Sequence, residues 1–235
     1  MSCWSVWNKV RWDAAEKKQG LKELKMYLGS SFEQYFDSSW SMAAKWHKEQ
    51  PINEKEIASF YKHADQYLYN LIIWHDSGDK HNFVPYFDEF RSRFGIQSVI
   101  DYGCGVGCEG LELVEKGFDV TFIDYACPST KFLQWRLRNR GLLVPLIDVE
   151  KINVLPDADT FWAIDVLEHM VDPLWVVDRL SDKTKLFVHR SEFGNDHGGR
   201  HPFHLNFDEV VLSDALRKKG FRHIPWPVVS VWLRD

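Results

Sequence analysis

The sequence lacks several features that would place it in a special class of protein. No stretch approaches the roughly 18 apolar residues of a membrane span, and no signal-peptide core stands at the N-terminus. The four cysteines form no CxxC pair and no disulfide-like framework. Reduced thiols indicate an intracellular protein, so we expect a cytoplasmic location. Internal repeats and low-complexity segments are also missing.

An excess of positive charge is missing as well. The chain has 29 Lys and Arg against 34 Asp and Glu, a formal net charge of −5 at pH 7. Phosphate contacts need clustered basic side chains, so this balance argues against a nucleic-acid partner. A basic run from Lys131 to Arg140 fits the solvated outer face of a helix. Hydrophobic residues at 45% and aromatic residues at 15% predict a folded globular protein.

Residues 1–94 carry helical apolar spacing and no convincing alternating strand pattern. We expect an N-terminal helical cap, or extension, with helices at Trp12–Leu28, Phe32–Trp46, Glu54–Trp74 and Phe83–Phe94. The aromatic stripe of the third helix can pack on the main domain or form a lid whose Tyr61, Tyr67 or Trp74 faces a substrate. An aromatic cap could also bury itself against a second copy of the chain, as a homodimer.

Residues 95–235 alternate between strand and helix patterns, which predicts an α/β domain with a parallel sheet. Helices are expected at 107–116, 128–140, 172–181 and 210–220. Strands are expected at 97–102, 118–124, 143–147, 160–166 and 184–190, with further strand material at 228–233. The carboxyl ends of such strands are where α/β sheets bind ligands.

The most informative stretch is SVIDYGCGVG, residues 98–107, in which an acid ends a strand and a glycine turn follows. Glycines let the backbone bend sharply and let a ligand approach closely. The carboxylate of Asp101 would repel a phosphate at this place and would suit an amine. The stretch resembles motif I of the class I S-adenosylmethionine (SAM) methyltransferases. The matching residues are Asp101, Gly103, Gly105 and Gly107, with Cys104 inside the turn.

That resemblance implies a doubly wound, mostly parallel seven-stranded sheet, the Rossmann-like methyltransferase fold, over residues 95–235. It also implies SAM as the cofactor, with its methionine part on the glycine turn. Asp124 ends the second strand, where a carboxylate can accept hydrogen bonds from ribose hydroxyls, and Tyr125 would stack on the adenine. After the third strand, the resemblance assigns Asp148 and Val149 to the adenine.

The fourth strand runs into FWAIDVLEHMVDP, which resembles the LEHxxDP stretch of ubiquinone-biosynthesis-type small-molecule methyltransferases. Asp165 would lie at the carboxyl end of this strand, beside the cofactor, together with Glu168 and His169. His169 could take a proton from a substrate hydroxyl or amine, because the unperturbed pKa of histidine lies near physiological pH. Alternatively, Glu168 and His169 only orient the loop and line the methionine part of the cofactor.

Four histidines crowd the segment after the fifth strand: His189, His197, His201 and His204. In one interpretation they line a substrate pocket, with His201 or His204 as a base or orienting group. In the other, Glu168, His169 and His204 bind a divalent metal ion. The second arrangement faintly resembles the small-RNA 2′-O-methyltransferases, whose ExxEH stretch and later histidine hold a metal.

The sequence therefore predicts a SAM-dependent methyltransferase that acts on an oxygen or nitrogen of a small molecule, without a metal. Three alternatives stay open. They are a metal-assisted RNA 2′-O-methyltransferase, a dinucleotide oxidoreductase, and a non-catalytic SAM-binding module that partners another protein through its aromatic helices.

Overall fold

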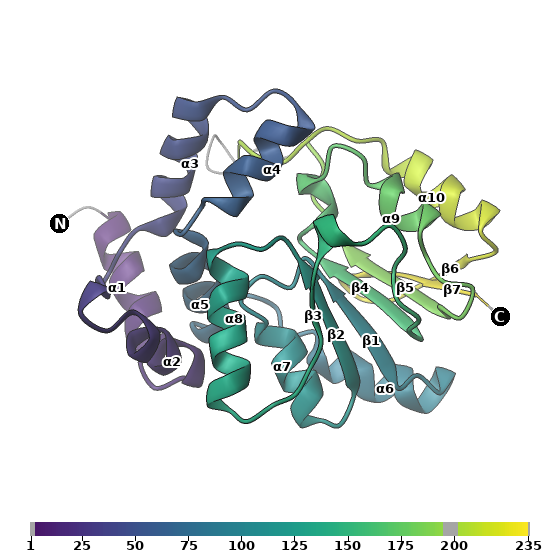
Figure 1. Cartoon of the computed structure of the whole chain (residues 1–235), viewed down its shortest axis with the longest axis horizontal. Helices are drawn as coiled ribbons and strands as arrows, with labels where there is room; N and C mark the ends of the chain where they lie inside the picture. Colours follow the sequence, from purple (N-terminus) through teal and green to yellow (C-terminus); the bar gives the residue numbers. More distant parts are fainter. Residues whose placement is uncertain (1–2, 195–201, 235) are drawn as a thin grey trace.

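A seven-stranded sheet forms the centre of the protein in a computed structural model that describes residues 3–194 and 202–234. The strand order is β3-β2-β1-β4-β5-β7-β6 (Figure 1). The five strands β3, β2, β1, β4 and β5 run parallel, and β7 pairs antiparallel with both β5 and β6. The strands are β1 Ser98–Tyr102, β2 Asp119–Asp124, β3 Leu146–Asp148, β4 Thr160–Ile164, β5 Leu186–Arg190, β6 Arg222–Ile224 and β7 Ser230–Leu233.

Helices cover both faces of the sheet, because side chains along each strand alternate between two apolar cores. Helices α6 (Val84–Phe94), α7 (Cys108–Glu115) and α8 (Pro128–Asn139) pack on one face. Helices α9 (Leu174–Asp178) and α10 (Glu209–Lys218) pack on the other. The predicted doubly wound, mostly parallel seven-stranded fold is confirmed.

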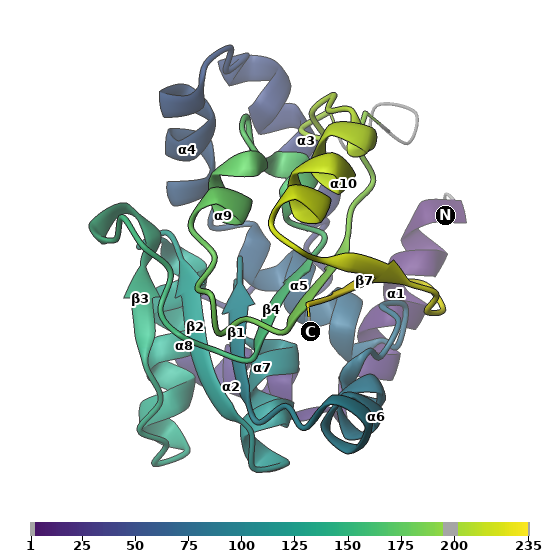
Figure 2. The ribbon, with the colours of Figure 1, turned by 90° about the vertical axis from the view of Figure 1, so that its right-hand side faces the viewer.

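Helices α3 and α4 lie above the carboxyl ends of the parallel strands, the end to which β1 points, whereas α1 and α2 lie beside the sheet, against α5 and α8 (Figure 2). We call residues 3–83 the cap segment. The domain boundary predicted at residue 94 stays a prediction. Helix α6, on its N-terminal side, packs in the core of the sheet. No described helix is long and apolar enough to cross a membrane. The cap helices are α1 Cys3–Ala15, α2 Gln19–Leu28, α3 Ser38–Glu49, α4 Glu54–Lys62 and α5 Tyr67–Asp76.

Of the four helices predicted for residues 1–94, Phe83–Phe94 is confirmed as α6, and the other three were wrong in their bounds. The stretch Trp12–Leu28 is two helices, because Lys18 adopts an extended conformation before α2. Glu54–Trp74 is also two helices, α4 and α5, which the segment 63–66 separates. The helix predicted from Phe32 begins instead at Ser38, where the Asp37 side chain accepts a hydrogen bond from Trp40 N and caps the first turn.

A buried ion cluster joins the cap to α8. Glu23 of α2 is fully buried, and its carboxylate accepts hydrogen bonds at 2.7 Å from Nε of both Arg136 and Arg140. Burial alone would raise the pKa of Glu23, but the hydrogen bonds from the two guanidinium groups lower it overall. Arg136 also donates to the carbonyl oxygen of Val106, within the glycine turn. The cap is thus anchored to the part of the molecule that forms the predicted cofactor site.

We expect Glu23→Gln to destabilise the protein by about 2–3 kcal/mol, because hydrogen bonds between charged groups are lost while two guanidinium groups stay in place. Chemical denaturation would measure this change. Glu16→Gln is the matched control, because the exposed pair of Glu16 with Lys25 contributes less than about 1 kcal/mol. Equal stabilities of the two variants would contradict the anchoring role of Glu23.

Candidate functional site

The glycine turn after β1 has the tight shape that its sequence predicts. Gly103, Gly105 and Gly107 all have positive φ angles, and Gly103 N donates to Ile123 O at 2.8 Å. A Cβ on Gly103 would lie 2.4 Å from a Val166 methyl group, so no larger residue fits without displacement. Gly107 leads directly into α7. The turn therefore lies between the ends of β1 and β2 and the loop after β4.

Asp124 fastens this turn from the neighbouring strand. Its two carboxylate oxygens accept hydrogen bonds from Gly105 N at 2.8 Å and from Tyr125 N at 2.7 Å. Each oxygen keeps a second lone pair, so both can still accept from a ligand hydroxyl. Burial raises the pKa of Asp124 to about 6, although the two backbone N–H groups oppose the shift. These contacts suit the ribose-binding role that the sequence predicts.

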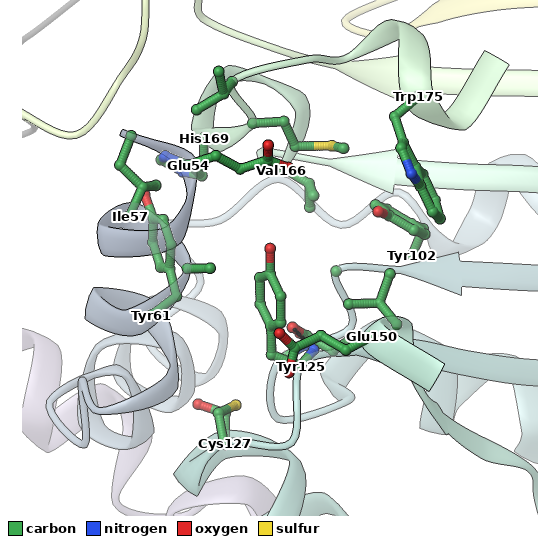
Figure 3. Close-up of a pocket in the computed structure, with 18 of the residues that line it drawn as sticks. Glu54, Ile57, Tyr61, Tyr102, Tyr125, Cys127, Glu150, Val166, His169 and Trp175 are labelled. Atoms are coloured by element: carbon green, nitrogen blue, oxygen red, sulfur yellow. Dashed lines mark hydrogen bonds between the residues drawn. The ribbon is translucent and has the colours of Figure 1, made fainter. Parts of the chain in front are cut away.

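A cavity of about 580 Å³ opens beside Asp124, between the strand ends and helices α4 and α5. In Figure 3, α4 contributes Tyr61 on one side, with Trp175 and Tyr102 opposite and Tyr125 below. Val166 and His169 of the loop after β4 complete the wall. Aromatic and aliphatic side chains with a few polar groups are typical of a small-molecule site.

The loop after β3 only partly follows the prediction. Val149 and Glu150 line the cavity. The Asp148 carboxylate instead accepts from Glu150 N at 3.2 Å and lies 3.1 Å from Lys151 Nζ, and Asp148 does not line the cavity. Its assignment to the adenine stays a prediction.

Two tyrosines of the cap place their hydroxyls inside the molecule. The hydroxyls of Tyr61 and Tyr67 are buried, and both residues line the cavity. Burial raises both pKa values above the usual range of a phenol, so both groups stay protonated at neutral pH. The aromatic stripe, for which the sequence left packing on the main domain and a lid both open, therefore supplies hydrogen-bond donors beside the cavity. At the rim, Lys62 pairs with Glu150 and places its ammonium group 5.4 Å from the centre of the Tyr125 ring, which links α4 to the sheet.

A second, smaller cavity of about 80 Å³ lies behind the glycine turn and shares Gly103 and Asp165 with the first. Three buried or nearly buried acids and one lysine line it: Asp101, Glu109, Asp165 and Lys80. Burial and the nearby Glu109 raise the pKa of Asp101 to about 7, and burial raises the pKa of Asp165 to about 6. Cys104 also lines this cavity.

The loop after β4 and the segment after β5 bring His169 and His204 together, with ring centres 5.0 Å apart. Glu168, His169 and His204 offer ligand atoms that lie within 4.8 Å of one another, the only such group among the described residues. Burial raises the pKa of Glu168 to about 8. His169 lines the large cavity, whereas Glu168 and His204 do not. The predicted catalytic His201 lies outside the described residues.

Backbone contacts fix the orientation of His169. Its Nδ1 lies 3.2 Å from Phe203 O, so in the tautomer in which Nδ1 donates, Nε2 is the atom that can accept a proton. Phe203 is itself buried among Met42, Trp46 and Phe60 of the cap. The position of His169 therefore depends on the packing of α3 and α4.

Comparisons with known proteins agree on the fold. A S-adenosylmethionine-dependent methyltransferase from Clostridium acetobutylicum has a TM-score of 0.55 and 10% identity, over 71% of this chain and 97% of that one. The mitomycin 7-O-methyltransferase MmcR has a TM-score of 0.53 and 13% identity, over 86% of this chain and 70% of that one. The methyltransferase domain of bacterial CtHen1-C has a TM-score of 0.52 and 16% identity, over 66% of this chain and 97% of that one. No protein-family model and no curated protein matches the sequence.

These similarities define the class of fold: the chain has the architecture of the class I SAM-dependent methyltransferases. The glycine turn, Asp124 and His169 lie around one large cavity, as the sequence predicts. Two contributors were missed. The sequence predicted no site role for Lys80 or Glu109, because only the tertiary fold brings them to Asp101.

Proposed function

We propose that this protein is an enzyme that transfers a methyl group from SAM to an oxygen or nitrogen of a small molecule. The observation that carries this proposal is the large cavity that joins the glycine turn and Asp124 to His169. The cap encloses this cavity from above, which suits a small acceptor better than an extended polymer. Asp124 would hold the ribose, Tyr125 and Val149 the adenine, and the glycine turn the methionine part.

Bound SAM supplies a methyl group already activated by the positive charge on its sulfur. The protein then has to hold the acceptor in line with that methyl group and keep water away, and such positioning contributes much of the rate. His169 Nε2 would take the proton that the acceptor hydroxyl or amine loses. The hydroxyls of Tyr61 and Tyr67 would donate hydrogen bonds to the acceptor and orient it.

A direct test combines binding with turnover. Isothermal titration should show that S-adenosylhomocysteine (SAH) binds and that NAD does not, and incubation with methyl-labelled SAM should label small hydroxylated or amine acceptors. Tighter binding of NAD would overturn the proposal in favour of an oxidoreductase. SAH binding without any labelled acceptor would favour the non-catalytic module.

One observation favours a second candidate, a metal-assisted RNA 2′-O-methyltransferase. Glu168, His169 and His204 provide one carboxylate and two imidazoles, a ligand set that suits several divalent metals, and Asp165 begins the same loop. The residues present therefore fit a metal ion, which would hold the acceptor ribose and polarise its hydroxyl.

A chelator distinguishes the two candidates. We expect EDTA to leave methyl transfer to a small acceptor unchanged within about twofold, because His169 acts there as a base and no metal is required. Loss of activity in EDTA that added Mg²⁺ or Mn²⁺ restores, together with labelling of RNA ends, would establish the second candidate instead.

A further inference from the structure

The charged side chains that line the large cavity are mostly acidic. Among the described residues the lining has one ammonium group, that of Lys55, and five carboxylates, those of Glu54, Asp124, Glu150, Asp165 and Asp172. Two of the acids have a cationic partner from outside the lining: Arg190 lies 2.7 Å from Asp165, and Lys62 pairs with Glu150. Three acids and one lysine remain, so the cavity carries a net negative charge and attracts cations.

Part of this negative charge lies on the acceptor side of the cavity. Figure 3 shows Glu54 and Tyr61 of α4 on the same side as His169, opposite Tyr102 and Trp175. The side chain of Glu54 is exposed in the first turn of α4 and forms no ion pair with another described residue. The described lining contains no arginine, so a carboxylate or phosphate on the acceptor would meet no guanidinium partner. The charge on this side therefore favours a cationic acceptor over an anionic one.

Two tyrosines give the same side the chemistry that an ammonium group needs. The ring of Tyr61 has its centre 5.6 Å from that of His169 and 5.8 Å from that of Tyr67. The hydroxyl oxygens of Tyr61 and Tyr67 are buried and have no hydrogen-bond partner among the described residues. A phenol oxygen can accept an N–H bond as well as donate, and the faces of aromatic rings attract cations. A group with several N–H donors and a positive charge would satisfy both features.

We propose that the acceptor is a small amine that enters the cavity as its ammonium ion. Glu54 attracts the ion at the opening, and the hydroxyls of Tyr61 and Tyr67 accept hydrogen bonds from its N–H groups beside His169. The inference rests on the proposed function and narrows it, since the methyl group would go to nitrogen and not to oxygen. It also assigns a specificity role to Glu54, which lies outside the cofactor motifs.

The transfer then balances in protons and charge. The ammonium group loses one proton to His169 Nε2, which frees the lone pair on its nitrogen. This lone pair forms the new N–CH₃ bond while the S–CH₃ bond of SAM breaks and the bonding electrons stay on sulfur. The positive charge of the sulfonium thus passes to the methylated amine, and uncharged sulfur leaves in SAH.

Probes that share a carbon frame and differ in one end group test the preference. Phenethylamine, phenethyl alcohol and hydrocinnamate present an ammonium, a hydroxyl and a carboxylate, and hexylamine, hexanol and hexanoate repeat the series on an aliphatic chain. In isothermal titration of the protein saturated with SAH, we expect each amine to bind about 10-fold more tightly than its alcohol, because charge-assisted hydrogen bonds are the stronger ones. The carboxylates should bind most weakly. Methyl-labelled SAM should label the amines.

Glu54→Gln tests the acid at the opening. We expect it to weaken binding of the amines by about 2- to 5-fold at low salt and by less at high salt, the usual size and screening of an exposed charge interaction. Affinity for the alcohols should stay the same. Glu49→Gln is the matched control, because it removes the same charge from an exposed position on α3 that does not line the cavity. It should leave the affinities for amines and alcohols unchanged.

Tyr67→Phe tests the hydroxyl acceptors while it keeps the aromatic ring. We expect it to weaken binding of the amines by about 10-fold and of the alcohols by less, since a hydrogen bond to a charged group contributes more than a neutral one. Thermal unfolding of each variant identifies any loss of folded protein. The ratio of amine to alcohol affinity within one preparation does not depend on the folded fraction.

Failure of this inference is distinguishable from failure of the proposed function. If wild-type protein does not bind SAH, the proposed function fails. If wild-type protein binds SAH but the amines bind no more tightly than the alcohols or carboxylates, or no amine is labelled, the inference is overturned. Equal effects of Glu54→Gln on amines and alcohols would remove the specificity role of Glu54.

Discussion

Replacing Asp124 by asparagine is expected to weaken the binding of SAH by about 100-fold or more, which corresponds to one or two lost charge-assisted hydrogen bonds. Both oxygens of Asp124 already accept from the backbone, at Gly105 N and Tyr125 N. The asparagine amide has one acceptor oxygen, and its NH₂ group would face one of these N–H donors. The substitution therefore removes a ribose acceptor and loosens the glycine turn.

Asp119→Asn is the control, because Asp119 begins the same strand and its side chain is exposed at the far end. We expect its SAH affinity to match that of the wild type in isothermal titration. An Asp124→Asn protein with normal SAH affinity would contradict both the ribose assignment and the fastening of the turn.

The second large effect concerns turnover rather than binding. We expect His169→Gln to lower kcat by about 10²- to 10⁴-fold, the usual contribution of a general base. The affinity for SAH should change by less than about threefold, because His169 lies on the acceptor side of the cavity and glutamine can still donate to Phe203 O. Single-turnover methyl transfer at several pH values measures the effect.

His63→Gln provides the comparison for His169, since His63 is an exposed cap histidine whose Nδ1 contacts Ser59 O. Its kcat should equal that of the wild type. If His169→Gln keeps the wild-type kcat and pH profile, the histidine only lines the loop, and the proton must leave by another route.

Short-range signals predicted the core of the fold. The acid and glycines of residues 101–107 reflect local backbone needs, namely a strand end and positive φ angles at fixed positions. Apolar runs such as Val99–Ile100 fix a buried strand regardless of what packs on it. The sequence therefore located β1, the turn and the start of α7 closely.

The cap was harder to predict because its apolar spacing continues across breaks. Ile57 and Phe60 of α4 and Leu68 and Ile72 of α5 are all buried, so the pattern reads as one helix through the segment 63–66. The N-cap Asp37, followed by two serines, was the signal that could have corrected the start of α3.

Side chains that meet only through the tertiary fold left no such signal. Helix α6 separates Lys80 from Asp101 of β1, and nothing in the spacing of the chain relates the two residues. Burial then changes their chemistry, as it raises the pKa of Asp101 to about 7. The sequence shows the charge of Lys80, but it does not show which acidic side chains surround it in the fold.

Phe203 connects access to the cavity with reactivity inside it. Its side chain packs under Trp46 and Phe60, and its carbonyl oxygen orients His169. A shift of α3 or α4 would therefore move Phe203 and, with it, the carbonyl oxygen that contacts His169 Nδ1. Under the proposed function, the base would then be in place only while the cap helices are packed on Phe203.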